Sequence, residues 1–310
     1  MTCAGIDPVV EWLLRSDPAV AYQARRDLLD EDDPRERALI ARSGTAAVIL
    51  AARRPDGHWG RGFSQPKWTS THYTLLELRD HHIDPGVTAC QEAVALCLEQ
   101  KGADGGVNPS GTISQSDVCI NGMLLASAAY FQARTPDLSS LVDFILSEQL
   151  GDGGFNCRSN RSGCRVSSVH TTSSVIDGFT EYLRAGHSHR ADEVEAARDA
   201  ATECLLARRL YQQKATGTPL HPEVVKLHHP PRWHFDVLRG LEMVTAAGVT
   251  HDERLQPALE ILQHRRRQDG RWAANAGYPG ERHVTYARAG TPNPWITLRA
   301  LRVIRALSAV

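Results

Sequence analysis

Apolar residues recur at helical spacing along almost the whole chain, and no segment of useful length alternates as a strand would. Between Pro8 and Leu29 the pattern predicts two short helices, broken just before Pro18, where proline suits a first helical turn. Near the other end, residues 295–307 carry one strongly apolar helical face. We therefore predict an almost wholly helical protein.

A glycine turn repeats between the predicted helices. A fixed period with an apolar helix on either side of such a turn is typical of stacked helical hairpins. Helices are expected before the turns at residues 87–98 and 138–150, and after them at 69–78, 117–131, 169–183, 233–241 and 295–307. The turns are Asp56-Gly57-His58-Trp59, Asp104-Gly105-Gly106-Val107, Asp152-Gly153-Gly154-Phe155 and Gln268-Asp269-Gly270-Arg271-Trp272, the first three each 48 residues apart.

The last predicted helix indicates how the array ends. An open solenoid needs polar terminal repeats, whereas residues 295–307 present an apolar face that must be covered. We therefore expect an all-α fold, an α/α toroid of about five to six helical hairpins. It would be one domain spanning residues 1–310, with the helices of residues 1–44 closing the ring and a cavity at one end.

Composition narrows the range of partners. The net charge is −1, so no basic surface is expected for nucleic acid. No apolar stretch approaches the eighteen or so residues of a membrane span, and the N-terminus does not resemble a signal peptide, so we expect a cytoplasmic protein.

The seven cysteines are odd in number and are expected to be reduced thiols. Cys157 and Cys164, with six residues between them, weakly indicate a second metal half-site.

Two of the predicted helices begin with side chains that bind metals. Asp117 and Cys119 open the helix after the second glycine turn, and His170 opens the helix after the third. If these helices are neighbours, oxygen, sulfur and nitrogen donors meet in a set that suits Zn²⁺, with a fourth position left for water or substrate. A structural interpretation is also open, in which Asp117 caps a helix, Cys119 is a small buried residue and His170 is a core histidine.

The glycine-aromatic turns, Gln268-Asp269-Gly270-Arg271-Trp272 above all, resemble the repeats of squalene-hopene cyclases and of protein prenyltransferase β subunits. The resemblance covers residues 45 to 305. Within that superfamily, Asp117-Val118-Cys119 is similar to the Asp-x-Cys of the prenyltransferase zinc site, and His170 matches the zinc histidine. The resemblance implies a Zn²⁺ cofactor and a small isoprenoid or alkyl substrate in the barrel cavity.

The chain departs from that family in its charged and aromatic residues. Prenyltransferases carry Arg and Lys just before Asp-x-Cys to hold a diphosphate, whereas residues 108–115 contain neither. Arg158, Arg161 and Arg165, on another loop, are the candidates for stabilising a leaving diphosphate. Only 6% of residues are aromatic, which gives little support to terpene cyclisation through carbocations.

Further candidate site residues come from two other units. His234 falls near the start of a predicted inner helix, where it would be a fourth zinc ligand or a general base. Asp236 would orient His234, and His72, at the start of the first inner helix, would line the cavity. We expect His228 and His229 to lie in a surface loop.

These residues together predict a zinc-dependent transferase or cyclase-like enzyme. Like prenyltransferases, it would activate a thiolate or water at an open zinc position toward a small molecule, an isoprenoid or alkyl substrate or a thiol. One alternative is a zinc-dependent hydrolase, lyase or terpene-cyclase-like enzyme. Another is a non-catalytic toroid that binds an isoprenoid or a partner protein, with a structural zinc closed by His234.

Overall fold

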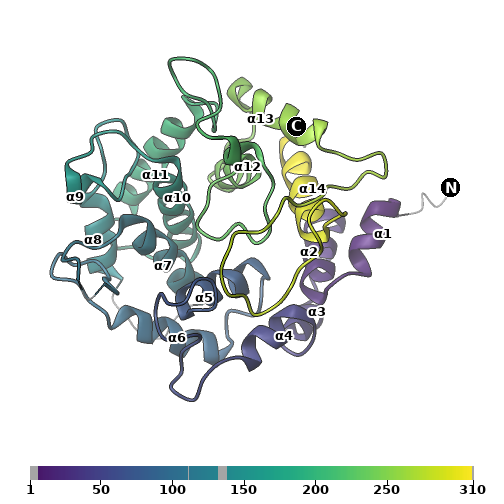
Figure 1. Cartoon of the computed structure of the whole chain (residues 1–310), viewed down its shortest axis with the longest axis horizontal. Helices are drawn as coiled ribbons and strands as arrows, with labels where there is room; N and C mark the ends of the chain where they lie inside the picture. Colours follow the sequence, from purple (N-terminus) through teal and green to yellow (C-terminus); the bar gives the residue numbers. More distant parts are fainter. Residues whose placement is uncertain (1–5, 111, 132–137, 309–310) are drawn as a thin grey trace.

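The computed structural model describes residues 6–110, 112–131 and 138–308, so Cys3 lies outside the described residues. Within these ranges the chain forms helices and three isolated β-bridges but no strand, and no helix has the length and hydropathy needed to cross a bilayer. Figure 1 shows the helices arranged as a ring. They are α1 (Pro8–Leu14), α2 (Pro18–Leu29), α3 (Pro34–Ile40), α4 (Gly44–Ala51), α5 (Thr71–Asp80), α6 (Thr88–Leu98), α7 (Val118–Tyr130), α8 (Ser139–Ser147), α9 (Ser159–Ser162), α10 (Val169–Arg184), α11 (Ala191–Leu206), α12 (Val237–Ala246), α13 (Gln256–His264) and α14 (Pro294–Ser308), with 3-10 turns η1 (Pro222–Val225) and η2 (Glu253–Leu255).

The ring has two layers. Helices α2, α5, α7, α10, α12 and α14 each contribute residues to the lining of one central cavity of about 760 Å³. Helices α4, α6, α8, α11 and α13 lie outside them, each preceding an inner helix in the chain (Figure 1). The last helix packs against α2, where Arg302 donates to Gln23 (2.7 Å) and pairs with Asp27 (2.8 Å). The α/α toroid predicted from the repeats is therefore confirmed.

The repeated Asp-Gly turn is built in the same way in all four places. Each aspartate accepts the backbone N–H two residues later at 3.0 to 3.3 Å, and each glycine has a φ between 77° and 87°, a region that favours glycine. The last residue of each turn then donates its N–H to a side chain near the start of the next inner helix. These pairs are Trp59 with Thr71, Val107 with Asn121, Phe155 with Thr172 and Trp272 with Thr297.

Two of these aspartates also fix the segment that precedes an inner helix. Asp104 accepts both the N–H (2.7 Å) and the hydroxyl (2.6 Å) of Ser116, directly before α7. Asp152 accepts the same two groups of Ser167, just before α10. The turn that defines the repeat therefore also sets where α7 and α10 begin.

Helices α7 and α10 approach each other closely because both carry glycine at their crossing. A methyl group on Gly122 would lie 2.7 Å from the carbonyl oxygen of Ser174, and one on Gly178 would meet the backbone of Gly122. No larger residue fits without moving one helix. This close approach keeps the N-terminal ends of α7 and α10 together.

One inner helix begins later than the apolar pattern suggested. The expected helix at residues 233–241 is α12, Val237–Ala246. Asp236 is its N-cap, because its side chain accepts the N–H of Arg239 at 2.8 Å. Trp233 and His234 therefore belong to the preceding loop, which lies across the mouth of the ring in Figure 1.

Candidate metal centre

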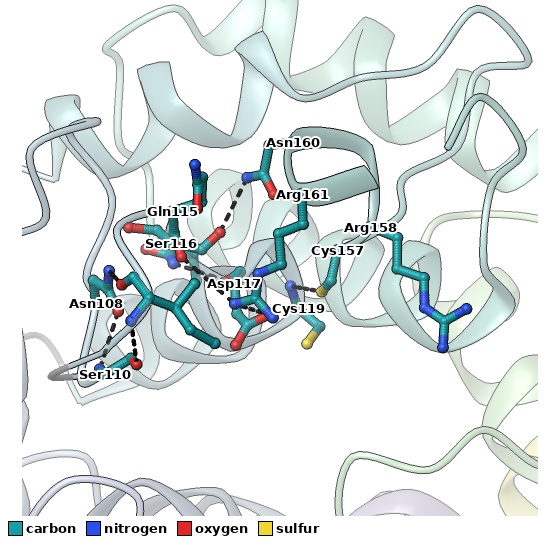
Figure 2. A network of polar contacts seen from close by, with 12 residues as sticks. Asn108, Ser110, Gln115, Ser116, Asp117, Cys119, Cys157, Arg158, Asn160 and Arg161 are labelled. Carbon is teal, nitrogen blue, oxygen red and sulfur yellow. Dashed lines mark hydrogen bonds and ion pairs between the residues drawn. The ribbon is translucent and has the colours of Figure 1, made fainter. Parts of the chain in front are cut away.

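Asp117, Cys119 and Cys157 come together at the N-terminal end of α7. One ligand atom from each lies within 4.8 Å of the others, and all three residues are half-buried. Across the described ranges, no other group of three or more His, Cys, Asp or Glu residues meets this criterion. Figure 2 shows the three side chains with the loop that covers them.

The three residues reach this place from two neighbouring repeats. Asp117 is the N-cap residue of α7, and Cys119 stands in its first turn. Cys157 follows the third Asp-Gly turn, in the loop between α8 and α9. The backbone N–H of Cys119 donates to Sγ of Cys157 at 3.1 Å, and the N–H of Cys157 donates to the hydroxyl of Thr171 at 3.4 Å.

The pKa values of the two thiols are shifted in opposite directions. The pKa of Cys157 is lowered, chiefly because the Cys119 side chain hydrogen-bonds to its sulfur. The pKa of Cys119 is raised, because that bond holds its proton and because the thiol is buried. Cys157 is therefore the first of the two to become a thiolate. Two thiols and one carboxylate form a donor set that fits Zn²⁺.

A basic loop covers this group. Arg161, in the short helix α9, forms an ion pair with Asp117 at 2.9 Å, and Asn160 donates to the carbonyl oxygen of Ser116 at 3.2 Å. Arg158 projects from the same loop in Figure 2 and is exposed. An anionic group that approached Asp117 and its neighbours would therefore meet guanidinium groups.

Cys164 lies on this loop but has different neighbours from Cys157. Its sulfur accepts a hydrogen bond from Asn156 at 3.4 Å and lies 3.5 Å from the carbonyl oxygen of Val166. It is not part of the metal group. The second metal half-site considered for Cys157 and Cys164 is therefore not formed, because Cys157 pairs with Cys119 instead.

His170 occupies the position in α10 that Cys119 occupies in α7. Asn121 and Thr172 accept equivalent hydrogen bonds from the two turns, and Cys119 and His170 each stand two residues before them. However, Nδ1 of His170 accepts the backbone N–H of Phe235 at 2.8 Å. Burial lowers the pKa of His170 to about 4, so the ring is neutral with its proton on Nε2. His170 is not part of the group formed by the other three.

The two further residues predicted in the fourth unit have separate surroundings. The ring of His234 is stacked between Trp233 and Tyr278, with centroids 3.9 and 3.6 Å away, and its centroid lies 6.1 Å from that of His170. Burial lowers the pKa of His234 to about 4. Asp236 caps α12 and accepts the N–H of His228 at 3.2 Å, so its carboxylate serves that histidine and the helix end rather than His234.

The histidines expected in a surface loop are in fact buried, which corrects that prediction. His228 is 1% exposed and His229 is 6% exposed, because the loop packs against α14, whose Arg299 donates to the carbonyl oxygen of His228 at 3.3 Å. His229 stacks on Trp295 at 4.8 Å. A Pro-rich, His-rich segment looks polar in sequence, but here its rings fill the interior of the ring.

His72 is buried at the start of α5. Its ring stacks on Phe63 (5.3 Å) and meets Tyr73 edge-on (5.2 Å), and its Nε2 has no hydrogen-bond partner in the described structure. Burial lowers its pKa to about 4. It is not among the residues that line the cavity of about 760 Å³ described above.

Comparisons with known proteins give no information about the residues of this site. No family model and no curated protein matches the chain. The chain is similar to a protein from Actinoplanes (14% identity, TM-score 0.47, covering 94% of this chain and 90% of that one). It is also similar to the apo type II terpene cyclase MstE from Scytonema (15% identity, TM-score 0.35, covering 88% and 97%). Likenesses this distant carry no conclusion about activity.

The sequence paired Cys157 with Cys164 and did not predict its contact with Cys119. Its signal was its position, three residues after the third Asp-Gly-Gly turn and therefore beside the start of the next inner helix. The loop between that turn and α10 is longer than the one before α7, since Asp152 bonds Ser167 fifteen residues on, whereas Asp104 bonds Ser116 twelve residues on. This extra length lets the loop fold over Asp117.

Proposed function

We propose that this chain is a zinc-dependent enzyme of the prenyltransferase and terpenoid-cyclase type. Asp117, Cys119 and Cys157 would hold the ion and act on a small molecule with an alkyl or isoprenoid part. The observation that carries the proposal is the meeting of one carboxylate and two thiols within 4.8 Å. Three such ligands are typical of catalytic zinc, whereas structural zinc is usually closed by four Cys or His ligands.

Bound zinc would lower the pKa of a thiol or water at its remaining position and so supply a nucleophile at neutral pH. The chain's own residues prepare for this. The N–H of Cys119 donates to the Cys157 sulfur, and the Thr171 hydroxyl lies 3.5 Å from the same atom. Both contacts favour the thiolate form in which cysteine binds metals.

Aromatic side chains at the same end of the ring suit an apolar substrate. Trp68, Tyr73 and Met123 pack together there, with Trp233 and Tyr278 against them. The pKa of Tyr73 is raised, first by burial of the phenol and then by its electrostatic interaction with Cys119 and Asp117. Tyr73 therefore remains a hydrogen-bond donor at neutral pH.

Two groups are available for the leaving group and for the proton. Arg161, paired with Asp117, would stabilise an anionic leaving group such as a diphosphate, and Arg158 of the same loop, which extends away from Asp117 in Figure 2, would need to turn to assist it. His234 is neutral at pH 7, since its pKa lies near 4, and would be a weak acceptor for the proton that the nucleophile releases, because an effective general base has a pKa near the working pH. Its stacking between two aromatic rings would hold it in one orientation.

The other candidate functions differ in what occupies the remaining zinc position. A hydrolase or lyase would need only water there, and a non-catalytic toroid would have a fourth protein ligand. His170 would be that ligand if its bond to Phe235 were broken. Both catalytic classes leave a zinc position open, whereas the structural class closes it. An added thiol that reaches the metal would therefore distinguish the catalytic classes from the structural one.

Cobalt substitution tests the proposal. Co²⁺ in the zinc site reports its ligands through absorption bands, and a small thiol such as 2-mercaptoethanol should add sulfur-to-metal charge-transfer intensity if a position is open. The Cys164→Ser variant, altered on the same loop but outside the metal group, should respond as the parent does. A parent spectrum that does not change with thiol would indicate a closed site and would contradict the proposed catalysis.

A further inference from the structure

The central cavity lies away from the metal group. Tyr130, at the C-terminal end of α7, lines it, whereas Cys119 stands in the first turn of the same helix. The thirteen residues of α7 put its two ends about 18 Å apart. Asp177 of α10 and Arg302 of α14, also beyond the first turns of their helices, line the cavity as well. Its volume of about 760 Å³ lies within the range of small-molecule binding pockets.

The lining of this cavity is strongly charged, unlike an isoprenoid pocket. Eight arginines and six carboxylates contribute to it. Seven of the eight arginines have a carboxylate within 4.0 Å, as Arg299 has in Glu242 (2.5 Å) and Arg302 in Asp27 (2.8 Å). Among the described residues, one lining arginine, Arg239, and one lining carboxylate, Asp80, have no ion-pair partner at this distance.

Arg239 carries a buried charge with no carboxylate within 4.0 Å among the described residues. The residue is 5% exposed, and its guanidinium donates to the carbonyl oxygens of Arg232 (2.6 Å) and His234 (3.4 Å). Its Nε is buried without a partner. A buried guanidinium that meets only neutral oxygens is costly to keep, since its desolvation is not offset by an opposite charge. Such a group is well suited to receive an anion from outside.

Asp80, the last residue of α5, lines the same cavity. Its pKa is raised because its carboxyl is desolvated, although the charges of Arg79, Arg239 and Arg299 act in the opposite direction. Burial therefore makes this carboxyl a weaker acid than a solvent-exposed aspartic acid. Next to these charges, Leu76, Met243 and Trp295 give the cavity an apolar wall.

We propose that this cavity is a second ligand site, which takes a small organic anion with its carboxylate or phosphate at Arg239 and its apolar body against Trp295. The Asp80 carboxyl then lies within the site as a hydrogen-bonding partner for a hydroxyl or amide of the ligand. The residues that line this site include none of the proposed metal ligands, although Arg239 also donates to the carbonyl oxygen of His234. It also differs from the isoprenoid cavity that the family resemblance implied, because its walls carry many charged groups beside aromatic faces such as Trp295.

Calorimetric titration of the full chain with phenyl phosphate and phenylacetate tests this proposal, with benzyl alcohol as the uncharged probe. We expect one site for at least one of the anions and none for the alcohol. Arg239→Gln should weaken anion binding at least tenfold. Arg305→Gln, at the cavity rim and paired with Asp30 (2.5 Å), should change it less than about threefold, as expected for a screened, exposed pair.

Three outcomes would overturn the proposal: no binding of either anion to the parent, equal binding by Arg239→Gln, or equally tight binding of benzyl alcohol. Asp80→Asn is a second variant in the same cavity, which removes a carboxyl and leaves the Arg239 guanidinium in place. It should bind the anion at least as tightly as the parent, and weaker binding would contradict the assigned geometry. Cys119→Ser should leave anion binding unchanged, so the failure of this proposal and that of the metal centre can be told apart.

Discussion

The backbone N–H of Cys119 points at the sulfur of Cys157, 3.1 Å away, although the two residues are 38 positions apart in the chain. One helix start thus provides a thiol, an N–H donor and, at Asp117, a carboxylate, and the neighbouring loop adds the second thiol. The relationship depends on the close packing of α7 on α10. It therefore connects the stability of the ring to the proposed metal centre.

The glycine contact between α7 and α10 yields the first prediction. Gly122→Ala should lower the free energy of unfolding by about 1 to 3 kcal/mol, because the added methyl group would meet the Ser174 carbonyl oxygen at 2.7 Å. Urea denaturation measures this. Gly151→Ala is the matched control, since nothing lies within 4 Å of its added methyl group. Equal stability of the two variants would contradict the packing described for these helices.

The second prediction concerns the buried ion pair of Glu77 and Arg232, which ties α5 to the loop before α12. Both side chains are almost fully buried, and Tyr286 also donates to Glu77 at 2.5 Å. Arg232→Met should destabilise the chain by about 3 to 5 kcal/mol, because Glu77 would remain as an uncompensated buried charge. Chemical denaturation gives the value.

Two further variants check the cause of that effect. Adding Glu77→Gln to Arg232→Met should restore part of the loss, since it removes the orphaned charge. Arg15→Met, which breaks an exposed pair with Glu11, should cost less than about 1 kcal/mol. A double variant no more stable than Arg232→Met would show that lost packing, rather than charge, dominates.

The third prediction is a loss of stability in mild acid. The pKa of His72 is lowered to about 4 in the folded chain, against about 6.5 when unfolded, so the unfolded state binds the proton first. Stability is therefore full above pH 6.5 and is lost as the pH falls toward 4. His72 alone should cost about 2 kcal/mol between pH 7 and pH 5.

The variant His72→Phe isolates this contribution. Phenylalanine keeps the stacking on Phe63 and removes the buried Nε2 that has no partner. Stability at pH 7 should be equal or higher, and the difference between pH 7 and pH 5 should shrink by about 2 kcal/mol. Thermal or urea unfolding at both pH values measures it. An unchanged pH dependence would mean that His72 is protonated without penalty in the fold.

The toroid could be predicted because its determinants are local. Each Asp-Gly turn has the same hydrogen bonds, and the next inner helix starts with a side chain that receives the following N–H. A repeated local motif implies repeated hairpins, and the apolar face of residues 295–307 required a partner. Asp117 and Cys119 could be placed at the start of an inner helix for the same reason, since they follow a recognisable turn.

The rest of the site depends on how irregular loops fold. Cys157 reaches Cys119 only because the loop before α10 bends over α7, and His170 is occupied by Phe235 from a loop 65 residues away. His228 and Asp236 are paired within that same loop. Neither periodicity nor spacing predicts such contacts, because they are set by the packing of segments distant in sequence.

Zinc content in a panel of single variants tests the metal centre most directly. The purified parent should hold about one zinc per chain, measured by mass spectrometry of the metal after dialysis against a weak chelator. Cys119→Ser and Cys157→Ser should each lose it, because each removes a ligand. His170→Ala and Cys164→Ser should retain it, because His170 is held by Phe235 and Cys164 lies outside the group. Zinc lost from His170→Ala but kept by Cys157→Ser would contradict the account.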